Sequence, residues 1–177
     1  MNLHFIVRIG MLCLVCGGLA LAAGQAQEIP AVGQKAPQVN LPSQDGSRVS
    51  LNEFHGKWVV LYFYPKDNTP GCTIEAHNFQ RDLAKYEEKN AVIIGVSVDS
   101  SASHQDFCTK QSLTFKLLAD TEKTVTAEYG SLRDNGMAAR NTFLIDPKGK
   151  IAKVWTGVKP QEHSEEILAT LAELQKN

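Results

Sequence analysis

Cysteine is scarce in this chain of 177 residues, which has four, at positions 13, 16, 72 and 108. The first two lie in an N-terminal segment where Arg8 precedes an almost wholly apolar or small run from residue 9 to residue 24, a pattern typical of a secretory signal. We predict a signal peptide over residues 1–26, cut between residues 22 and 26. Its removal leaves only Cys72 and Cys108, and two cysteines in an exported chain favour one disulfide.

The apolar N-terminal run is also short, with roughly sixteen residues against the ~20 that a membrane-spanning helix needs. An uncleaved membrane anchor is therefore the less favoured alternative. A lipoprotein signal is rejected, because neither Cys13 nor Cys16 follows the Leu and small-residue pattern of such signals. We expect a periplasmic or otherwise exported protein with no stable membrane association after the leader is removed.

The chain also lacks any block of charge of one sign. Lys and Arg number 18 against 19 Asp and Glu, which gives a net charge of −1. Without a basic block, nucleic acid and anionic membranes are poor candidate partners. Repeats, low-complexity segments and linkers are lacking too, so residues 27–177 are predicted to form a single domain with a hydrophobic core of its own.

The elements predicted from the pattern begin with a strand, a helix and a second strand. Residues 58–63 and 91–98 are continuous apolar runs rich in β-branched and aromatic residues, the pattern of strands buried on both faces. Between them Ala76, Phe79, Leu83 and Tyr86 recur at spacings of three and four, which predicts a helix that starts near Cys72.

The flanking segments predict an N-terminal hairpin and a mixed sheet covered by helices on both faces. The hairpin lies within residues 28–51 and turns at Asp45-Gly46. The remaining predicted elements are a helix that follows the capping residues 99–103 and runs to about 111, a strand over 115–118, a helix over 122–129, a hairpin of 142–145 with 151–155, and an amphipathic helix over 164–174.

Cys72 is the candidate nucleophile, because unpaired N–H groups and the positive end of the dipole favour a thiolate in the first turn of a helix. Pro65 and Pro70 stiffen the loop before it. The Thr69 hydroxyl can point towards the sulfur or an oxygen bound beside it. Gly71 leaves room for a small substrate to approach the backbone.

A reactive thiolate also needs a cation, and Arg140 is the candidate because it immediately precedes a predicted strand. A surface arginine is the alternative. Lys66 and Asp67 are interpreted as loop charges in water. Glu75 is interpreted as a first-turn contact with the helix N-terminus.

These residues carry a resemblance to a known family. The run PKDNTPGCT resembles the P-x-x-x-T-x-x-C signature of the peroxiredoxins, and FYPKDNTPGCTIEA is similar to their bacterioferritin-comigratory, or Q-type, branch. The runs GKWVVLYFYP, GVSVDS, LLAD and RNTFLIDPKGKI also resemble that branch, so the likeness covers essentially the whole mature chain.

The resemblance implies a thioredoxin-like α/β fold and a thiol peroxidase that needs no cofactor and no metal. Cys72 would be the peroxidatic cysteine, with Thr69 and Arg140 binding and polarising the peroxide and Pro65 shielding the pocket. Hydrogen peroxide and small organic hydroperoxides would oxidise Cys72 to a sulfenic acid. The resemblance further implies a monomer and a thioredoxin-like dithiol as the reductant.

The chain departs from the commonest Q-type pattern, which places the resolving cysteine five residues after the peroxidatic one, where this chain has His77. A second form of the branch keeps the resolving cysteine on the helix after the second strand, where Cys108 lies. The resemblance then implies an atypical 2-Cys enzyme with an intramolecular Cys72–Cys108 disulfide. Because a disulfide needs Cα atoms within about 7 Å, we expect both helices to unwind locally. A buried spectator thiol is the alternative for Cys108.

The sequence also allows three alternatives. A thioredoxin-like periplasmic thiol-disulfide oxidoreductase relies on Cys-x-x-Cys, but Glu75 fills the fourth position of that motif when it is counted from Cys72. A binding domain with a purely structural disulfide remains open. A zinc site of Cys72, His77, His104 and Cys108 is disfavoured, because its spacings resemble no standard site.

Overall fold

The computed structural model describes residues 28–176. The predicted signal peptide falls outside the described residues. Within them, five strands form one sheet in the order β5-β4-β3-β6-β7. Strands β3 (Trp58–Phe63), β4 (Ala91–Ser97) and β5 (Lys116–Ala119) pair in parallel. Strand β6 (Thr142–Ile145) pairs antiparallel with β3, and β7 (Ile151–Trp155) pairs antiparallel with β6.

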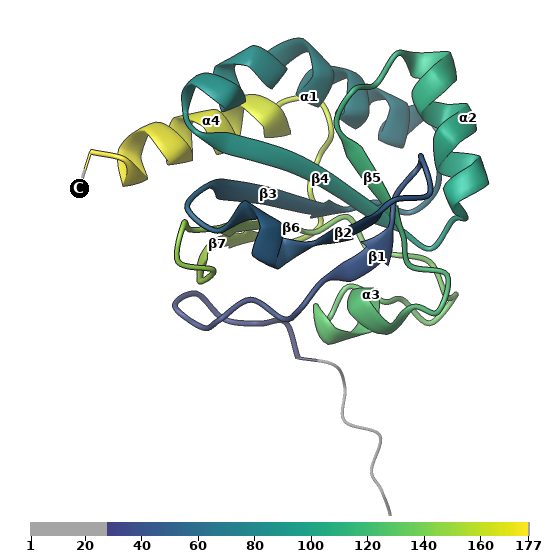
Figure 1. Ribbon diagram of the computed structural model, residues 1–177, viewed down its shortest axis with the longest axis horizontal. Coiled ribbons are helices and arrows are strands. Elements are labelled where there is room, and N and C mark those ends of the chain that lie inside the picture. The colour runs from purple at the N-terminus through teal and green to yellow at the C-terminus, as the bar shows by residue number, and fades with distance from the viewer. Residues whose placement is uncertain (1–27, 177) are drawn as a thin grey trace, which may run out of the picture.

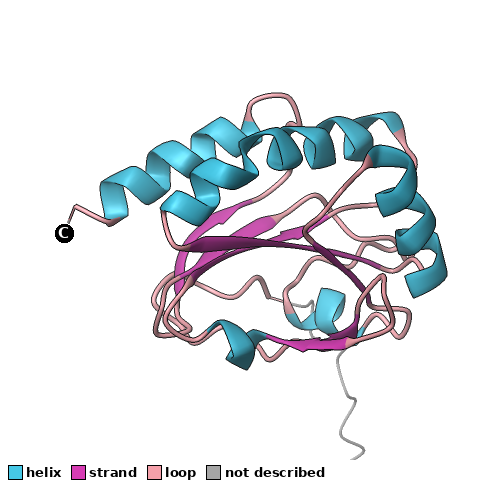
Figure 2. Cartoon of the chain, turned by 45° about the horizontal axis from the view of Figure 1, so that its top comes forward, coloured by secondary structure: helices cyan, strands magenta, loops and turns pink. Residues whose placement is uncertain are grey.

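The two faces of the sheet are covered by different elements (Figures 1 and 2). One face carries α1 (Pro70–Glu88), α2 (Ser101–Gln111) and α4 (His163–Leu174). The other carries the hairpin of β1 (Asn40–Pro42) and β2 (Arg48–Ser50), the 3-10 turn η1 (Leu51–Phe54) and the short helix α3 (Thr124–Glu128). The predicted mixed sheet with helices on both faces is confirmed, and the long helices all lie on one side.

Strand β3 shows why the sheet needs both covers. Val60 and Tyr62 enter the core beneath α1 and α4, whereas Val59, Leu61 and Phe63 enter the core beneath the hairpin and α3. Successive side chains of a strand point to opposite faces, so a continuous apolar run is buried on both sides. The sequence pattern predicted this central position.

Element boundaries differ from the predictions in a few places. The helix predicted over 122–129 spans only Thr124–Glu128, because Lys123 adopts the left-handed conformation (φ 61°) and cannot be part of a right-handed helix. The strand predicted over 91–98 ends at Ser97, and the one predicted over 115–118 begins at Lys116. The Asp45-Gly46 turn is confirmed, with Gly46 at φ 80°.

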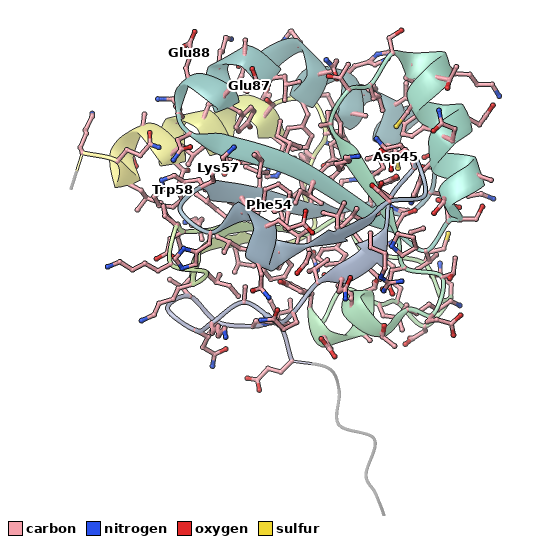
Figure 3. All side chains as sticks on the ribbon, in the orientation of Figure 1. Asp45, Phe54, Lys57, Trp58, Glu87 and Glu88 are labelled. Carbon is pink, nitrogen blue, oxygen red and sulfur yellow. The ribbon has the colours of Figure 1, made fainter. Side chains whose placement is uncertain are left out.

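Because β3 and β4 are parallel neighbours, their carboxyl-terminal ends lie at the same end of the sheet. Trp58, at the start of β3, lies at the opposite end of the molecule from α2 (Figure 3). The loop from β3 to α1 therefore emerges on the α2 side. No helix in residues 28–176 combines the length and apolar character required to cross a membrane.

Candidate active site

Cys72 is the third residue of α1, directly after the β3 strand and its connecting loop. Thr69 is the N-cap and Pro70 the first helical residue, a position where proline costs no hydrogen bond and fixes φ for the helix. The Cys72 side chain is buried, with 2% of the residue exposed. The helix start predicted from the sequence is confirmed, and the sulfur sits below the surface.

Arg140 reaches Cys72 because β6 pairs with β3. Phe63 N–H donates to the Asn141 carbonyl at 2.8 Å, so the residue before β6 lies beside the loop that leaves β3. Arg140 Nη2 donates to Cys72 Sγ at 3.4 Å. The predicted pairing of these two residues, 68 positions apart, is thus present in the structure.

Gly71 makes the approach of Arg140 possible. A Cβ at this position would lie 3.2 Å from Arg140 Nη2, closer than ordinary van der Waals contact. From the sequence, this space is expected to admit a small substrate. In the structure the guanidinium occupies the space next to the Gly71 backbone.

Glu75 holds the other side of the guanidinium, and its predicted role at the helix N-terminus is wrong. It is the sixth residue of α1, beyond the first turn, and its buried carboxylate accepts a hydrogen bond from Arg140 Nη1. Burial raises the pKa of Glu75 to about 7, although Arg140 acts in the opposite direction. Burial alone would lower the pKa of Arg140, but the charges of Glu75 and Cys72 outweigh it and raise that pKa.

Thr69 and Pro65 lie in the loop without touching the sulfur through a hydrogen bond. The Thr69 hydroxyl donates to the Lys66 carbonyl at 2.9 Å, which leaves its oxygen lone pairs available as acceptors. Pro65 is half-buried at the start of the loop. Of the predicted site residues, the structure joins Arg140 directly to Cys72 and places Thr69 at the helix entry beside it.

Cys108 is the second free cysteine of the described residues and is buried in α2. Both cysteines belong to the core between the sheet and the three long helices. Burial raises the pKa of Cys108 to about 11, with the Asp67 carboxylate adding to the effect and Lys116 opposing it. Cys108 is therefore a neutral thiol while α2 is packed in place.

Asp67 corrects a second interpretation from the sequence. The sequence predicts a loop charge in water, but the Asp67 side chain is 2% exposed and pairs with the buried His104 of α2. The sequence signal was weak, since the partners are 37 positions apart. Lys66 is exposed as predicted.

The four residues of the zinc alternative do not form a set, because His77 is exposed whereas Cys72, His104 and Cys108 are buried. Within residues 28–176 no group of three or more His, Cys, Asp or Glu side chains is arranged to hold a metal ion. His163, which had no motif around it, is buried and lies 2.8 Å from the Thr142 hydroxyl through Nε2. Burial lowers the pKa of His163 to about 4.

Comparisons with known proteins agree with this geometry. The AhpC/TSA family profile matches residues 32–154. The chain is 43% identical over 151 residues to Peroxiredoxin Bcp of Bacillus subtilis, which covers 81% of this chain and 96% of that protein. A cysteine-to-serine mutant of Xylella fastidiosa PrxQ superimposes with a TM-score of 0.78 at 34% identity, covering 82% of this chain and 97% of the other.

Xanthomonas campestris Peroxiredoxin Q has also been solved as two separate cysteine-to-serine mutants. It is 34% identical to this chain with a TM-score of 0.72, and the superposition covers 76% of this chain and 90% of the X. campestris chain. The two mutated cysteines are 36 positions apart, the same separation as Cys72 and Cys108. These likenesses confirm the thioredoxin-like fold expected from the sequence. The chain belongs to the AhpC/TSA family, and as a peroxiredoxin of the Bcp/peroxiredoxin Q group it is a thiol peroxidase.

Proposed function

We propose that this enzyme reduces hydrogen peroxide and small organic hydroperoxides at Cys72, with Arg140 and Thr69 binding the peroxide and Pro65 shielding the pocket. The observation that carries the proposal is the 3.4 Å contact from Arg140 Nη2 to Cys72 Sγ in the first turn of α1. A guanidinium and the N–H groups of a helix N-terminus both attract negative charge, as an attack on a peroxide requires.

The first step transfers one peroxide oxygen to sulfur. The Cys72 thiolate attacks the nearer oxygen, a sulfur–oxygen bond forms, the O–O bond breaks, and the departing oxygen takes a proton to leave as water or an alcohol. Negative charge grows on the departing oxygen, so donors fixed beside it stabilise the transition state more than the ground state. Arg140, held from behind by Glu75, is such a donor.

The second step joins the two cysteines. The Cys108 thiolate attacks the sulfur of the Cys72 sulfenic acid, the S–S bond forms, and the S–O bond breaks with release of hydroxide, which becomes water. Both cysteines are buried on different helices, so local unwinding of the first turn of α1 and of α2 accompanies this step. The matching separation of the two mutated cysteines in the X. campestris enzyme supports Cys108 as the resolving residue.

The third step restores the dithiol. A thioredoxin-like partner gives two electrons and two protons, its own dithiol becomes a disulfide, and the Cys72–Cys108 bond is reduced. With the signal peptide proposed over residues 1–26, the partner belongs to the periplasm or another exported compartment. We propose a monomer that binds neither nucleic acid nor membrane. The disulfide oxidoreductase alternative is not favoured, because Glu75 stands where a second cysteine would be needed and is ion-paired to Arg140.

Substitution of each cysteine tests the assignment. Cys72→Ser should abolish peroxide consumption with any thiol donor, and full activity in this variant would refute the proposal. Cys108→Ser should keep the first turnover, lose the disulfide, slow recycling by a protein dithiol, and over-oxidise more readily at Cys72. Mass spectrometry before and after one equivalent of peroxide measures all of these. A Cys108→Ser enzyme that cycles at the wild-type rate would remove Cys108 from the mechanism.

A further inference from the structure

The loop before the peroxidatic cysteine is attached to the helix of the second cysteine by a buried polar network. Asp67 Oδ2 lies 2.8 Å from His104 Nδ1 and accepts a bond of 2.7 Å from the Ser103 hydroxyl. Asp67 Oδ1 accepts a bond of 2.8 Å from the Tyr64 hydroxyl. The Asp67 backbone N–H donates to the Asp99 carboxylate at 2.9 Å, two residues before α2 begins. One carboxylate therefore connects the end of β3, the active-site loop and α2.

The hydrogen-bond partners of His104 come from two different segments of the chain. Its Nε2 lies 3.1 Å from the Leu118 carbonyl oxygen, which can only accept. Its Nδ1 faces Asp67, whose other neighbours are donors. Each ring nitrogen therefore has an oxygen partner inside the core, one from the active-site loop and one from β5. Burial raises the pKa of Asp67, but its bond to His104 and the charge of that ring outweigh burial and lower the pKa.

The pair joins the two segments that disulfide formation has to separate from the core. The N-terminal end of α1 lies next to α2 in both ribbon views (Figures 1 and 2). A second, exposed link joins the loop to α2 where Asn68 Nδ2 lies 3.4 Å from Asp106 Oδ2. Removing one partner of a buried, hydrogen-bonded pair leaves the other group without its bond, so such a pair resists opening.

We propose that the Asp67–His104 pair is a latch that holds the two redox segments in their reduced packing and sets the rate at which Cys108 is released to react with oxidised Cys72. The inference rests on the proposed function and adds positioning residues to it. Neither Asp67 nor His104 is hydrogen-bonded to Cys72 or Cys108. They act through the helix and the loop that they join.

The latch has a chemical consequence at the sulfur. While it is closed, burial first and the Asp67 charge second keep the pKa of Cys108 raised, so the thiol cannot attack. When α2 opens, Cys108 enters water, loses its proton and displaces hydroxide from the Cys72 sulfenic acid. A tight latch gives a second peroxide more time to over-oxidise Cys72, and a loose latch gives it less.

Asp67→Asn is the direct test, because it keeps the size of the side chain but removes the charge that faces His104. We expect disulfide formation after one equivalent of hydrogen peroxide to become about tenfold faster, which corresponds to about 1.4 kcal/mol. Amide hydrogen exchange of the reduced protein should speed up in residues 66–73 and 101–111. Over-oxidation at a given peroxide concentration should fall. Ser103→Ala, which removes one donor, should act in the same direction by about threefold.

The chain offers matched controls at Asp82 and Ser164. Asp82 is also a fully buried carboxylate, accepts from Arg81, Lys85 and the Ser164 hydroxyl, and connects α1 to α4. Asp82→Asn and Ser164→Ala should lower stability without speeding disulfide formation or exchange in residues 101–111. They separate a specific latch from a general loss of stability.

The latch is overturned if Asp67→Asn and Asp82→Asn change the disulfide rate by the same factor, or if Asp67→Asn leaves exchange in residues 101–111 at the wild-type level. Should Asp67→Asn fail to fold, Ser103→Ala against Ser164→Ala decides the same question. Hydrogen exchange of the reduced protein tests the latch without peroxide, whereas Cys72→Ser tests the peroxidase assignment. The two proposals can therefore fail separately.

Discussion

At the scale of single residues, the site is built from one guanidinium shared between a sulfur and a carboxylate. Arg140 donates through Nη2 to Cys72 and through Nη1 to Glu75. The planar fork of an arginine suits such a double contact, whereas a lysine offers only a compact point charge. The position of Arg140 is therefore set on one side by Glu75 and on the other by the absence of a side chain at Gly71.

Gly71→Ala should slow the reaction with peroxide while leaving the fold intact. The new methyl would lie 3.2 Å from Arg140 Nη2 and 3.9 Å from its Cζ, so the guanidinium has to shift by a few tenths of an ångström. Gly71 has no positive φ, and alanine is favoured over glycine within a helix by about 1 kcal/mol. We expect a rate about three- to tenfold lower, because small displacements of catalytic groups are costly, with Tm unchanged or raised.

Stopped-flow mixing of the reduced variant with hydrogen peroxide, paired with thermal unfolding, measures both effects. A variant with raised Tm and the wild-type rate would show that the placement of Arg140 does not limit the peroxide step. A fall in both rate and Tm would point instead to a disturbed helix.

Residue types and local spacing predicted Cys72, Thr69 and Arg140, but not the partners of buried charges. Arg140 stood out because it immediately precedes a predicted strand. Glu75 and Asp67 were misinterpreted, since their partners lie 65 and 37 positions away and only the packed structure brings them together. Long-range pairing of charges leaves no periodic signal in a single sequence.

At the scale of elements, strands were predicted better than short helices. The ranges 58–63, 142–145 and 151–155 match β3, β6 and β7, because apolar runs and a strong turn define them locally. Helix α3 was predicted too long, since a left-handed residue at its start depends on its surroundings. The insertion of β6 beside β3, which positions Arg140, was not specified by any local pattern.

Ser112→Gly should stabilise α2 and slow disulfide formation. Ser112 ends this helix in the left-handed conformation, with φ 54° and ψ 41°, where glycine lacks the steric cost of a Cβ. We expect the free energy of unfolding to rise by about 0.5–1 kcal/mol. If α2 has to unwind before Cys108 reacts, disulfide formation should slow by roughly two- to fivefold, the factor that corresponds to that energy.

Lys123→Gly is the matched control for this prediction. Lys123 is also left-handed, with φ 61°, but it begins α3 on the opposite face of the sheet. Lys123→Gly should gain similar stability without changing the rate of disulfide formation. That rate is measured by alkylating the remaining free thiols at intervals after a single addition of peroxide. Equal slowing in both variants would attribute the effect to global stability and not to α2.

At the scale of the whole molecule, two buried titratable groups oppose each other in their effect on stability. The pKa of Glu75 is raised by burial to about 7 from 4.5, so the folded protein holds this proton more tightly than the unfolded chain. Its contribution is fully present below pH 4.5 and is lost as the pH rises through 7. The pKa of His163 is lowered by burial to about 4 from 6.5, so its contribution is present above pH 6.5 and lost as the pH falls through 4.

Between about pH 4.5 and 6.5 the two slopes therefore cancel in part, and single substitutions should separate them. In Glu75→Gln only His163 still titrates, so the free energy of unfolding should rise with pH across this window. In His163→Gln only Glu75 still titrates, so the free energy of unfolding should fall with pH. Each slope has an upper limit of about 1.4 kcal/mol per pH unit, the value for one proton. The lowered pKa values of Asp67 and Asp82 place their titration below this window.

Urea unfolding of the reduced proteins at constant ionic strength, at several pH values from 4.5 to 6.5, measures the slopes directly. The wild type should give the flattest profile, because the stability that His163 contributes as the pH rises offsets the stability that Glu75 loses. Both groups lie near Arg140. Its positive charge lowers the pKa of His163 and acts against the burial that raises the pKa of Glu75. If both variants instead gave the same pH profile as the wild type, burial would not shift the pKa of Glu75 upward or that of His163 downward. Slopes of opposite sign in the two variants would show that Glu75 and His163 make opposing contributions to the pH dependence of the free energy of unfolding.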